Sequence, residues 1–125
     1  MAIQRTTKLV AIVDDDDSIR SALLGMLRVV GLPAQAFSSA EEFLKSGQQH
    51  QIACLIADIR MPGMSGLELQ ARLEVEQRQI PILFISAHGD EEMRLRALRA
   101  GAVEFLAKPF DRNVLLDCVR AALQS

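Results

Sequence analysis

The sequence has no marked excess of charge of either sign. Its 125 residues include 14 lysines and arginines against 16 aspartates and glutamates, so the net charge is only -2 at pH 7. A chain without a strong overall field gives no reason to expect general binding to nucleic acid or to an anionic membrane surface. Charge that serves a function in this protein must therefore act locally.

The sequence also lacks a long apolar run near its start. The N-terminal segment MAIQRTTK is followed by only five apolar residues before acidic residues begin. Such a run is too short for the core of a signal peptide and far too short to span a membrane. We therefore expect a cytoplasmic protein that makes no contact with membranes.

Cysteine is scarce, with only Cys54 and Cys118 in the chain. Their separation does not match the spacing of metal ligands, and two cysteines are too few for a disulfide scaffold. We interpret both as reduced residues that pack in the interior.

A linker or low-complexity segment that would separate two domains is also missing. The chain is long enough for one hydrophobic core, and 50% of its residues are hydrophobic. We therefore expect a single domain over residues 1–125.

What the sequence does contain is an alternation of strand-like apolar runs and segments of helical period. This alternation is typical of repeated βα units, which build a parallel sheet covered by helices on both faces. The expected strands are 9–13, 34–37, 53–57, 82–85 and 103–106. The expected helices run from 16 or 17 to Gly31, from Ser39 to Gly47, from 65 towards 78, from Asp90 to Gly101, and onward from Asp111.

Acidic residues follow two of these strands. Asp14 and Asp15 begin the run "DDDD" after the first strand, and Asp58 ends the third. The carboxyl ends of parallel strands meet at one edge, where three carboxylates would repel one another unless a cation lies among them. Oxygen ligands favour Mg²⁺, which completes its shell with phosphate oxygens. Two acids of the run would serve the metal and two the helix start, although the pattern leaves open which pair is which.

Two further strand ends supply groups that suit a phosphate. Ser86 ends the fourth strand with a hydroxyl that can donate to a phosphoryl oxygen, and Lys108 follows the fifth with a compact positive charge. An aspartate in such a pocket can act as a nucleophile towards phosphorus and form an acyl phosphate. The ordinary alternative is that all these residues are unrelated strand-end, cap and turn residues.

The segments "VDDDDSIR", "ADIRMPGMSGLEL", "ILFISAHGD" and "GAVEFLAKPF" together closely resemble the receiver domain of two-component response regulators. The resemblance covers nearly the whole chain and is greatest to the FixJ/NarL type of transcriptional regulator. It implies a flavodoxin-like α/β fold of five βα units with strand order 2-1-3-4-5. It also implies a module that a histidine kinase phosphorylates, and that catalyses only its own phosphorylation and dephosphorylation rather than acting as an enzyme on other substrates.

Carried over to this sequence, the resemblance implies a role for each matching residue. Asp58 would be the phospho-acceptor, with Ser86 as the switch hydroxyl, Phe105 as the switch aromatic, and Lys108 as the phosphate-binding lysine before a cis Pro109. The metal ligands would be Asp14, Asp15, Asp58 and the backbone carbonyl of Arg60, holding Mg²⁺ or, as a substitute, Mn²⁺. No effector domain is expected in this chain, which would be an isolated receiver or a stand-alone regulator, and DNA would be contacted only through an effector domain.

Two further expectations concern regulation. Arg60 and His88 could set the phosphoryl lifetime by controlling the approach of water, although both could instead be solvated loop residues. An apolar surface made of Leu95, Leu98, Phe105 and Leu116 is expected to support a phosphorylation-dependent homodimer.

Two other classes of function fit the sequence less well. A phosphatase with an aspartate nucleophile also uses Mg²⁺, but it needs a carboxylate two residues after the nucleophile, where Arg60 follows Asp58. A flavodoxin-like cofactor binder needs a phosphate-binding loop after the first strand, where four aspartates would repel a flavin phosphate.

Overall fold

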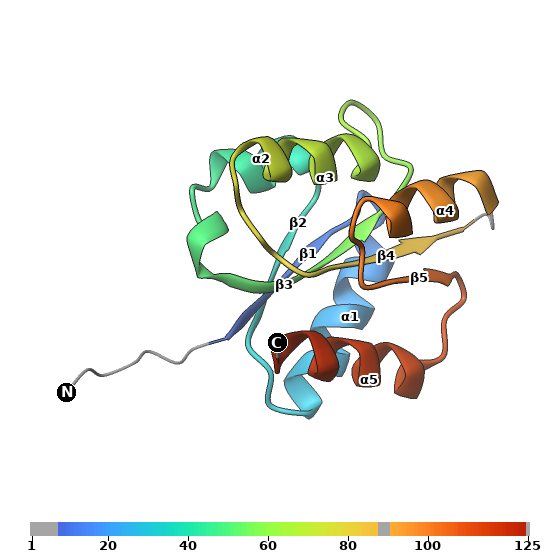
Figure 1. Cartoon of the computed structure of the whole chain (residues 1–125). Coiled ribbons are helices and arrows are strands. Elements are labelled where there is room, and N and C mark those ends of the chain that lie inside the picture. Colours follow the sequence, from blue (N-terminus) through green and yellow to red (C-terminus); the bar gives the residue numbers. More distant parts are fainter. Residues whose placement is uncertain (1–7, 88–90, 125) are drawn as a thin grey trace.

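The computed structural model describes residues 8–87 and 91–124, in which strands and helices alternate along the chain (Figure 1). The strands are β1 (Leu9–Val13), β2 (Ala34–Phe37), β3 (Ile52–Asp58), β4 (Ile82–Ser86) and β5 (Glu104–Ala107). The helices are α1 (Asp17–Val29), α2 (Ala40–Lys45), α3 (Gly66–Val75), α4 (Glu91–Arg99) and α5 (Arg112–Leu123), with a short 3-10 turn at Gln49–Gln51. No helix among the described residues is long and apolar enough to span a membrane.

The strands form one parallel sheet in the order β2-β1-β3-β4-β5, as expected from the resemblance. Successive residues of a strand point to opposite faces. In β1, Ala11 and Val13 pack with one apolar cluster, while Val10 and Ile12 pack with the other. Helices α2, α3 and α4 cover the first face, and α1 and α5 cover the second (Figure 1). The sheet is therefore doubly wound, with a core on each side.

Three helices end in the same backbone turn. After α1, the N–H of Leu32 donates to the carbonyl of Leu27 and Gly31 has a φ of 77°; Gly101 ends α4 in the same way. This turn needs one residue in the left-handed region, which glycine adopts without a steric penalty. After α3 the left-handed residue is Gln77, with a φ of 60°. The third helix therefore ends earlier than the expected 78, because a glutamine adopts the conformation usually taken by glycine.

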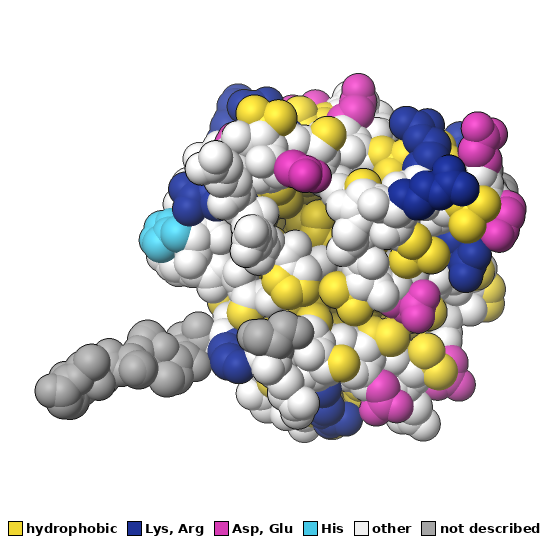
Figure 2. All heavy atoms as spheres, viewed as in Figure 1, with side chains coloured by type: hydrophobic (Ala, Val, Ile, Leu, Met, Phe, Trp, Pro, Cys, Tyr) yellow, Lys and Arg dark blue, Asp and Glu magenta, His cyan; other side chains and the backbone are white. Residues whose placement is uncertain are grey.

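A groove of about 790 Å³ lies at the amino ends of β4 and β5, beneath α3. Figure 2 shows it as a hollow with an apolar floor near the centre of the face. Its lining includes Leu73, Gln77, Ile82, Gly101 and Val103. This groove lies at the opposite end of the sheet from the acidic residues.

The division of the four aspartates is visible at the start of α1. The carboxylate of Asp16 accepts hydrogen bonds from the N–H groups of Ser18 (2.8 Å) and Ile19 (3.2 Å), which makes it the N-cap. Asp17 lies in the first turn, where a negative charge favours the helix dipole. Asp16 and Asp17 therefore serve the helix start. The expected cap of α4, Asp90, lies outside the described residues.

The two cysteines are both free thiols. Cys54 is fully buried, and burial raises the pKa of its thiol to about 12. Cys118 is only half-buried, so the expectation of a buried packing residue is confirmed for Cys54 and only partly met by Cys118.

Candidate functional site

Three carboxylates meet at the carboxyl edge of the sheet. Strands β1 and β3 pair with Val13 opposite Ala57, so the next residues along the two strands, Asp14 and Asp58, are neighbours. One carboxylate oxygen from each of Asp14, Asp15 and Asp58 lies within 4.8 Å of the others. Asp14 is fully buried and Asp58 is 6% exposed, whereas Asp15 is exposed. The expected cluster is therefore present as a geometric arrangement.

Lys108 connects two of these acids. Its Nζ donates to Oδ2 of Asp14 at 3.0 Å and to Oδ2 of Asp58 at 3.2 Å, and its side chain is 14% exposed. The N–H of Lys108 donates to the carbonyl of Ser86 at 2.7 Å, which ties the residue to the end of β4. The following bond to Pro109 is cis, as the resemblance implied. Lys108 thus partly offsets the charge of the acidic cluster.

The surroundings of Asp58 make its charged form less favourable than it would be in water. Burial raises the pKa of Asp58, and the charge of Asp14 raises it further, while Lys108 and the N–H of Arg60 oppose the shift without cancelling it. For Lys108, burial alone lowers the pKa, but its contacts with Asp14 and Asp58 outweigh burial and raise the pKa overall. The contacts of Lys108 with Asp58 therefore lower the pKa of Asp58 by less than burial and Asp14 raise it.

The donor set fits a hard divalent cation. All three clustered side chains offer carboxylate oxygens, and two of them are buried in a position where a further positive charge would lower their repulsion. No nitrogen or sulfur ligand belongs to this cluster among the residues the structure describes. The arrangement is therefore suited to Mg²⁺ rather than to zinc or copper.

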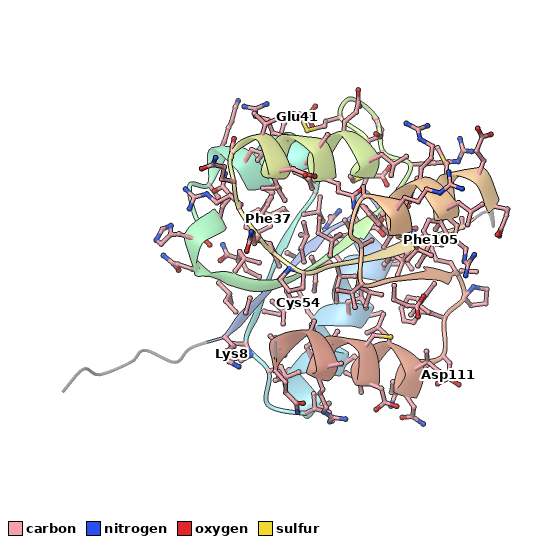
Figure 3. All side chains as sticks on the ribbon, in the orientation of Figure 1. Lys8, Phe37, Glu41, Cys54, Phe105 and Asp111 are labelled. Atoms are coloured by element: carbon pink, nitrogen blue, oxygen red, sulfur yellow. The ribbon has the colours of Figure 1, made fainter. Side chains whose placement is uncertain are left out.

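The expected hydroxyl also lies at this edge. Strands β3 and β4 pair with Asp58 opposite Ile85, so Ser86 is one residue further towards the edge and is only 1% exposed. On β5, Phe105 pairs with Phe84, is 7% exposed and packs in the core beneath α4 (Figure 3). Its ring is therefore on the inside in this structure.

The chain segment after β3 passes close to Asp58. The N–H of Arg60 donates to Oδ1 of Asp58 at 3.3 Å, while the Arg60 residue itself is exposed. A Cβ at Gly66 would lie 2.4 Å from the carbonyl oxygen of Asp58 and 2.9 Å from the ring of Phe84. Only glycine fits this position, which explains the glycine that ends "MPGMSG".

Arg20 lies near the site and was not predicted from the sequence. The guanidinium of Arg20 donates to the backbone carbonyl of Asp14 at 2.7 Å and to the carboxylate of Asp17 at 2.9 Å. Arg20 thus fastens the segment after β1 to the first turn of α1. The spacing of three residues between Asp17 and Arg20 was an available signal for their ion pair, but the bond to Asp14 depends on the side-chain conformation.

Only some of the residues expected to form an apolar surface are exposed. Leu95 is 38% exposed and Leu98 is half-buried, so both reach the surface of α4. Leu116 is only 5% exposed and packs in the core between the sheet, α1 and α5. The prediction that Leu116 extends the surface was wrong, because its side chain belongs to the apolar cluster that also contains Leu23 and Leu27 of α1. His88 lies outside the described residues.

A doubly wound sheet with strand order 2-1-3-4-5 and acids at its carboxyl edge defines a flavodoxin-like receiver fold. The family described as the response regulator receiver domain matches residues 10–120. The chain belongs to this family. It is accordingly a receiver domain of the kind found in two-component response regulators, which bind Mg²⁺ at this acidic pocket and receive a signal from a cognate kinase.

Its relatives include transcriptional regulators. The chain is 47% identical over 116 residues to the response regulator protein TodT of Pseudomonas putida, a match that covers 93% of this chain and 51% of TodT. It is 38% identical over 114 residues to the transcriptional regulatory protein FixJ of Azorhizobium caulinodans, covering 91% of this chain and 54% of FixJ. The chain thus spans about half the length of the curated relatives it matches.

A solved structure gives the same fold. The crystal structure of FixJ-N superposes with a TM-score of 0.85 at 36% identity and covers 98% of this chain and 96% of that chain.

Proposed function

We propose that this receiver domain accepts a phosphoryl group on Asp58 from a cognate histidine kinase, in a reaction that depends on Mg²⁺. The observation that carries the proposal is the cluster of three carboxylates within 4.8 Å, bridged on one side by Lys108. Like charges held this closely are costly unless a cation lies among them, and a bound cation in turn favours a phosphoryl group at the site.

Among the three acids, Asp58 is best placed to be the acceptor. Asp14 is fully buried and its carboxylate already accepts from the N–H of Asp16 at 2.8 Å, so an incoming donor cannot reach it. Asp15 is exposed and receives no contact from Lys108 among the described interactions. Asp58 combines slight exposure with the contact to Lys108 that an acyl phosphate needs.

The roles of the chain's own residues follow from these positions. Asp14, Asp15, Asp58 and the carbonyl of Arg60 would hold Mg²⁺, or Mn²⁺ in its place. When bound, the metal offsets the negative charge of the carboxylates and of the phosphoryl oxygens. A carboxylate oxygen of Asp58 forms the new bond to phosphorus while the bond from phosphorus to the kinase histidine breaks, and its electron pair stays on the imidazole nitrogen. Lys108 then transfers its hydrogen bond from the carboxylate to a phosphoryl oxygen.

The signal would leave the site through Ser86 and Phe105. The hydroxyl of Ser86, near Asp58 at the end of β4, donates to the new phosphoryl oxygen, which draws Ser86 inward. Phe105 lies one strand away and is buried without a polar group that fixes its ring, so its packing can change with that movement. The face formed by α4, β5 and α5 changes as a result.

We propose that this face mediates a symmetric homodimer after phosphorylation. Leu95 and Leu98 reach the surface of α4 beside Phe105, and they are the residues from which such a contact would form. Control of transcription would then depend on an effector domain outside these residues that contacts DNA. Sedimentation of the phosphorylated protein at high concentration tests the dimer, which an unchanged monomer would contradict.

The domain would act as a signalling module rather than as an enzyme on other substrates. It would catalyse only its own phosphorylation and the slow hydrolysis of the acyl phosphate, in the cytoplasm. Arg60 and His88 would tune that hydrolysis by limiting the approach of water. Unchanged hydrolysis rates in Arg60→Ala and His88→Ala would contradict this tuning role.

The decisive experiment is intact-mass spectrometry after incubation with acetyl phosphate, with and without Mg²⁺. We expect the gain of one hydroxylamine-sensitive phosphoryl group that requires Mg²⁺. It should be lost in Asp58→Asn and retained in Asp117→Asn, which makes the same change on the exposed side of α5. A wild-type protein that binds Mg²⁺ and gains no phosphoryl group would overturn the proposal.

A further inference from the structure

The segment between β3 and α3, residues 59–65, is called the site loop here because it directly follows Asp58. Backbone hydrogen bonds fix the two ends of this loop. The N–H of Ile59 donates to the carbonyl of Ile85 at 3.2 Å, and the N–H of Gly66 donates back to the carbonyl of Ile59 at 2.9 Å. At its far end, Ser65 and Glu68 form a reciprocal capping box at the start of α3. The carbonyl of Arg60, the expected metal ligand, lies between these fixed ends.

The tip of the site loop is held by a residue from another part of the chain. A carboxylate oxygen of Glu41, Oε2, accepts a hydrogen bond from the N–H of Met64 at 2.9 Å, across 23 residues of sequence. The same oxygen occupies the space beside Gly63, where a Cβ would lie only 2.6 Å away. Gly63 also has a φ of 76°, which favours glycine. The carboxylate therefore fits closely against the turn at the tip of the site loop.

Glu41 lies on a helix that buried side chains anchor to the core. It lies on the short helix α2 between Ala40 and Phe43, which are both fully buried. The ring of Phe43 packs edge-on against Phe37 with a centroid distance of 5.3 Å, and Figure 3 shows Glu41 on the outer side of α2 above Phe37. A fixed helix thus supplies the acceptor.

Glu42, the next residue, makes different hydrogen bonds, so Glu41 and Glu42 are not interchangeable. The carboxylate of Glu42 accepts from the N–H of Ser38 at 2.6 Å and from its hydroxyl at 3.1 Å, at the start of its own helix. Glu42 therefore serves α2, and Glu41 is the acid that crosses to the site loop. Met64 also packs partly against the same apolar cluster as α2.

We propose that Glu41 is a positioning residue of the phosphorylation site. By holding the N–H of Met64, it keeps the site loop in the conformation that directs the carbonyl of Arg60 towards the acidic cluster. Glu41 touches neither the phosphoryl group nor the metal. Because it acts through the carbonyl of Arg60, a metal ligand, its loss should change the affinity for Mg²⁺ rather than the rate of the transfer step. This inference rests on the proposed function, because it assigns Arg60 to the metal site.

The test compares three variants by NMR titration of the labelled protein with Mg²⁺ alone. Glu41→Ala removes the acceptor, Glu41→Gln keeps an acceptor oxygen but removes the charge, and Glu74→Ala removes one exposed charge from α3 far from the loop. We expect Glu41→Ala to weaken Mg²⁺ binding by about fivefold, the factor that corresponds to the net contribution of one hydrogen bond. Glu41→Gln and Glu74→Ala should stay within about twofold of the wild-type protein.

A second readout separates positioning from damage to the fold. The Met64 amide should lose protection from hydrogen exchange in Glu41→Ala and regain it in Glu41→Gln. With acetyl phosphate, the Mg²⁺ concentration for half-maximal phosphorylation should rise in Glu41→Ala, while the rate at saturating Mg²⁺ stays within about twofold of wild type.

Two results would overturn the inference: Mg²⁺ affinity in Glu41→Ala equal to that in Glu74→Ala, or Glu41→Gln as impaired as Glu41→Ala. Failure of the proposed function would look different. The wild-type protein would then bind Mg²⁺ without accepting a phosphoryl group, and the titration would still report on Glu41.

Discussion

The two ends of the parallel sheet are held together by different interactions. At the carboxyl end, Asp14 and Asp58 are buried close to one another and share a single lysine, Lys108. At the amino end, helices finish in backbone turns at Gly31, Gln77 and Gly101, next to the buried side chains of Leu27 and Leu73. Buried like charges oppose folding, whereas apolar contacts and satisfied helix ends favour it. The comparison indicates that the carboxyl end carries the chemistry at a cost in stability which the rest of the fold offsets.

The largest change in the free energy of unfolding should come from a buried apolar side chain at the amino end of the sheet. Leu27 on α1 is fully buried, and its substitution by alanine keeps the helix but leaves a cavity. We expect Leu27→Ala to lower the free energy of unfolding by about 3 kcal/mol, as measured by urea denaturation. The exposed Val29→Ala on the same helix is the matched control and should change it by less than about 0.5 kcal/mol. Equal effects in the two variants would contradict the assignment of this core.

The next largest effect should come from Lys108, which pairs with two buried acids. We expect Lys108→Met to lower the free energy of unfolding by roughly 2 kcal/mol at pH 7 without divalent ions, because both carboxylates lose their cation. The loss should shrink as the pH falls and the acids become protonated. In the wild type, the raised pKa of Lys108 means that its contribution is complete from the pH at which the acids are ionised up to the unfolded pKa of the lysine. It disappears as the pH rises through the folded value. Lys45→Met, at an exposed position of α2, serves as the control.

A change of opposite sign is expected at Asp58. Burial and Asp14 raise the pKa of Asp58, so its charged form disfavours the folded state above that pKa. We expect Asp58→Asn to raise the free energy of unfolding by about 1 kcal/mol at pH 7 without divalent ions, a typical size for one substitution. The gain should shrink as the pH falls through the folded pKa and vanish below the unfolded pKa, because the wild-type carboxyl is then neutral in both states.

Saturating Mg²⁺ provides the complementary measurement for Asp58. The wild-type protein should be stabilised by the metal more than Asp58→Asn is, because a ligand that binds only the folded state shifts its stability by mass action. A thermal midpoint of Asp58→Asn below that of the wild type without metal would contradict the view that Asp58 is held at a cost.

Much of this arrangement could be predicted from the sequence because it depends on local patterns. The strand β1 and the cap at Asp16 follow from apolar runs and helix-start residues. The meeting of Asp14 with Asp58 follows from the rule that parallel strands share a carboxyl edge.

The failures of prediction have physical causes. Leu116 is buried in an apolar cluster that includes Leu23 and Leu27 of α1 as well as sheet residues, and the helical stripe of α5 does not reveal that cluster. The hydrogen bonds between Arg20 and Asp14 and between Glu41 and Met64 each join a side chain to a backbone group. Nearly every residue has such a backbone group, so the residue types in the sequence do not predict these bonds. Contacts of this kind depend on side-chain conformation and on tertiary placement.

Gln77 provides the smallest prediction and a direct test of the amino end. It is the only non-glycine residue with a positive φ among residues 8–87 and 91–124, and it takes the position that glycine takes after α1 and α4. We expect Gln77→Gly to raise the free energy of unfolding by about 0.5 kcal/mol, because relief of the left-handed strain exceeds the added flexibility of the unfolded chain. Gln79→Gly, two residues further on, relieves no such strain and should be neutral or destabilising. Thermal unfolding of both variants checks this prediction. If both variants lose stability, Gln77 is held by side-chain contacts, and the amino end would depend on more than backbone turns.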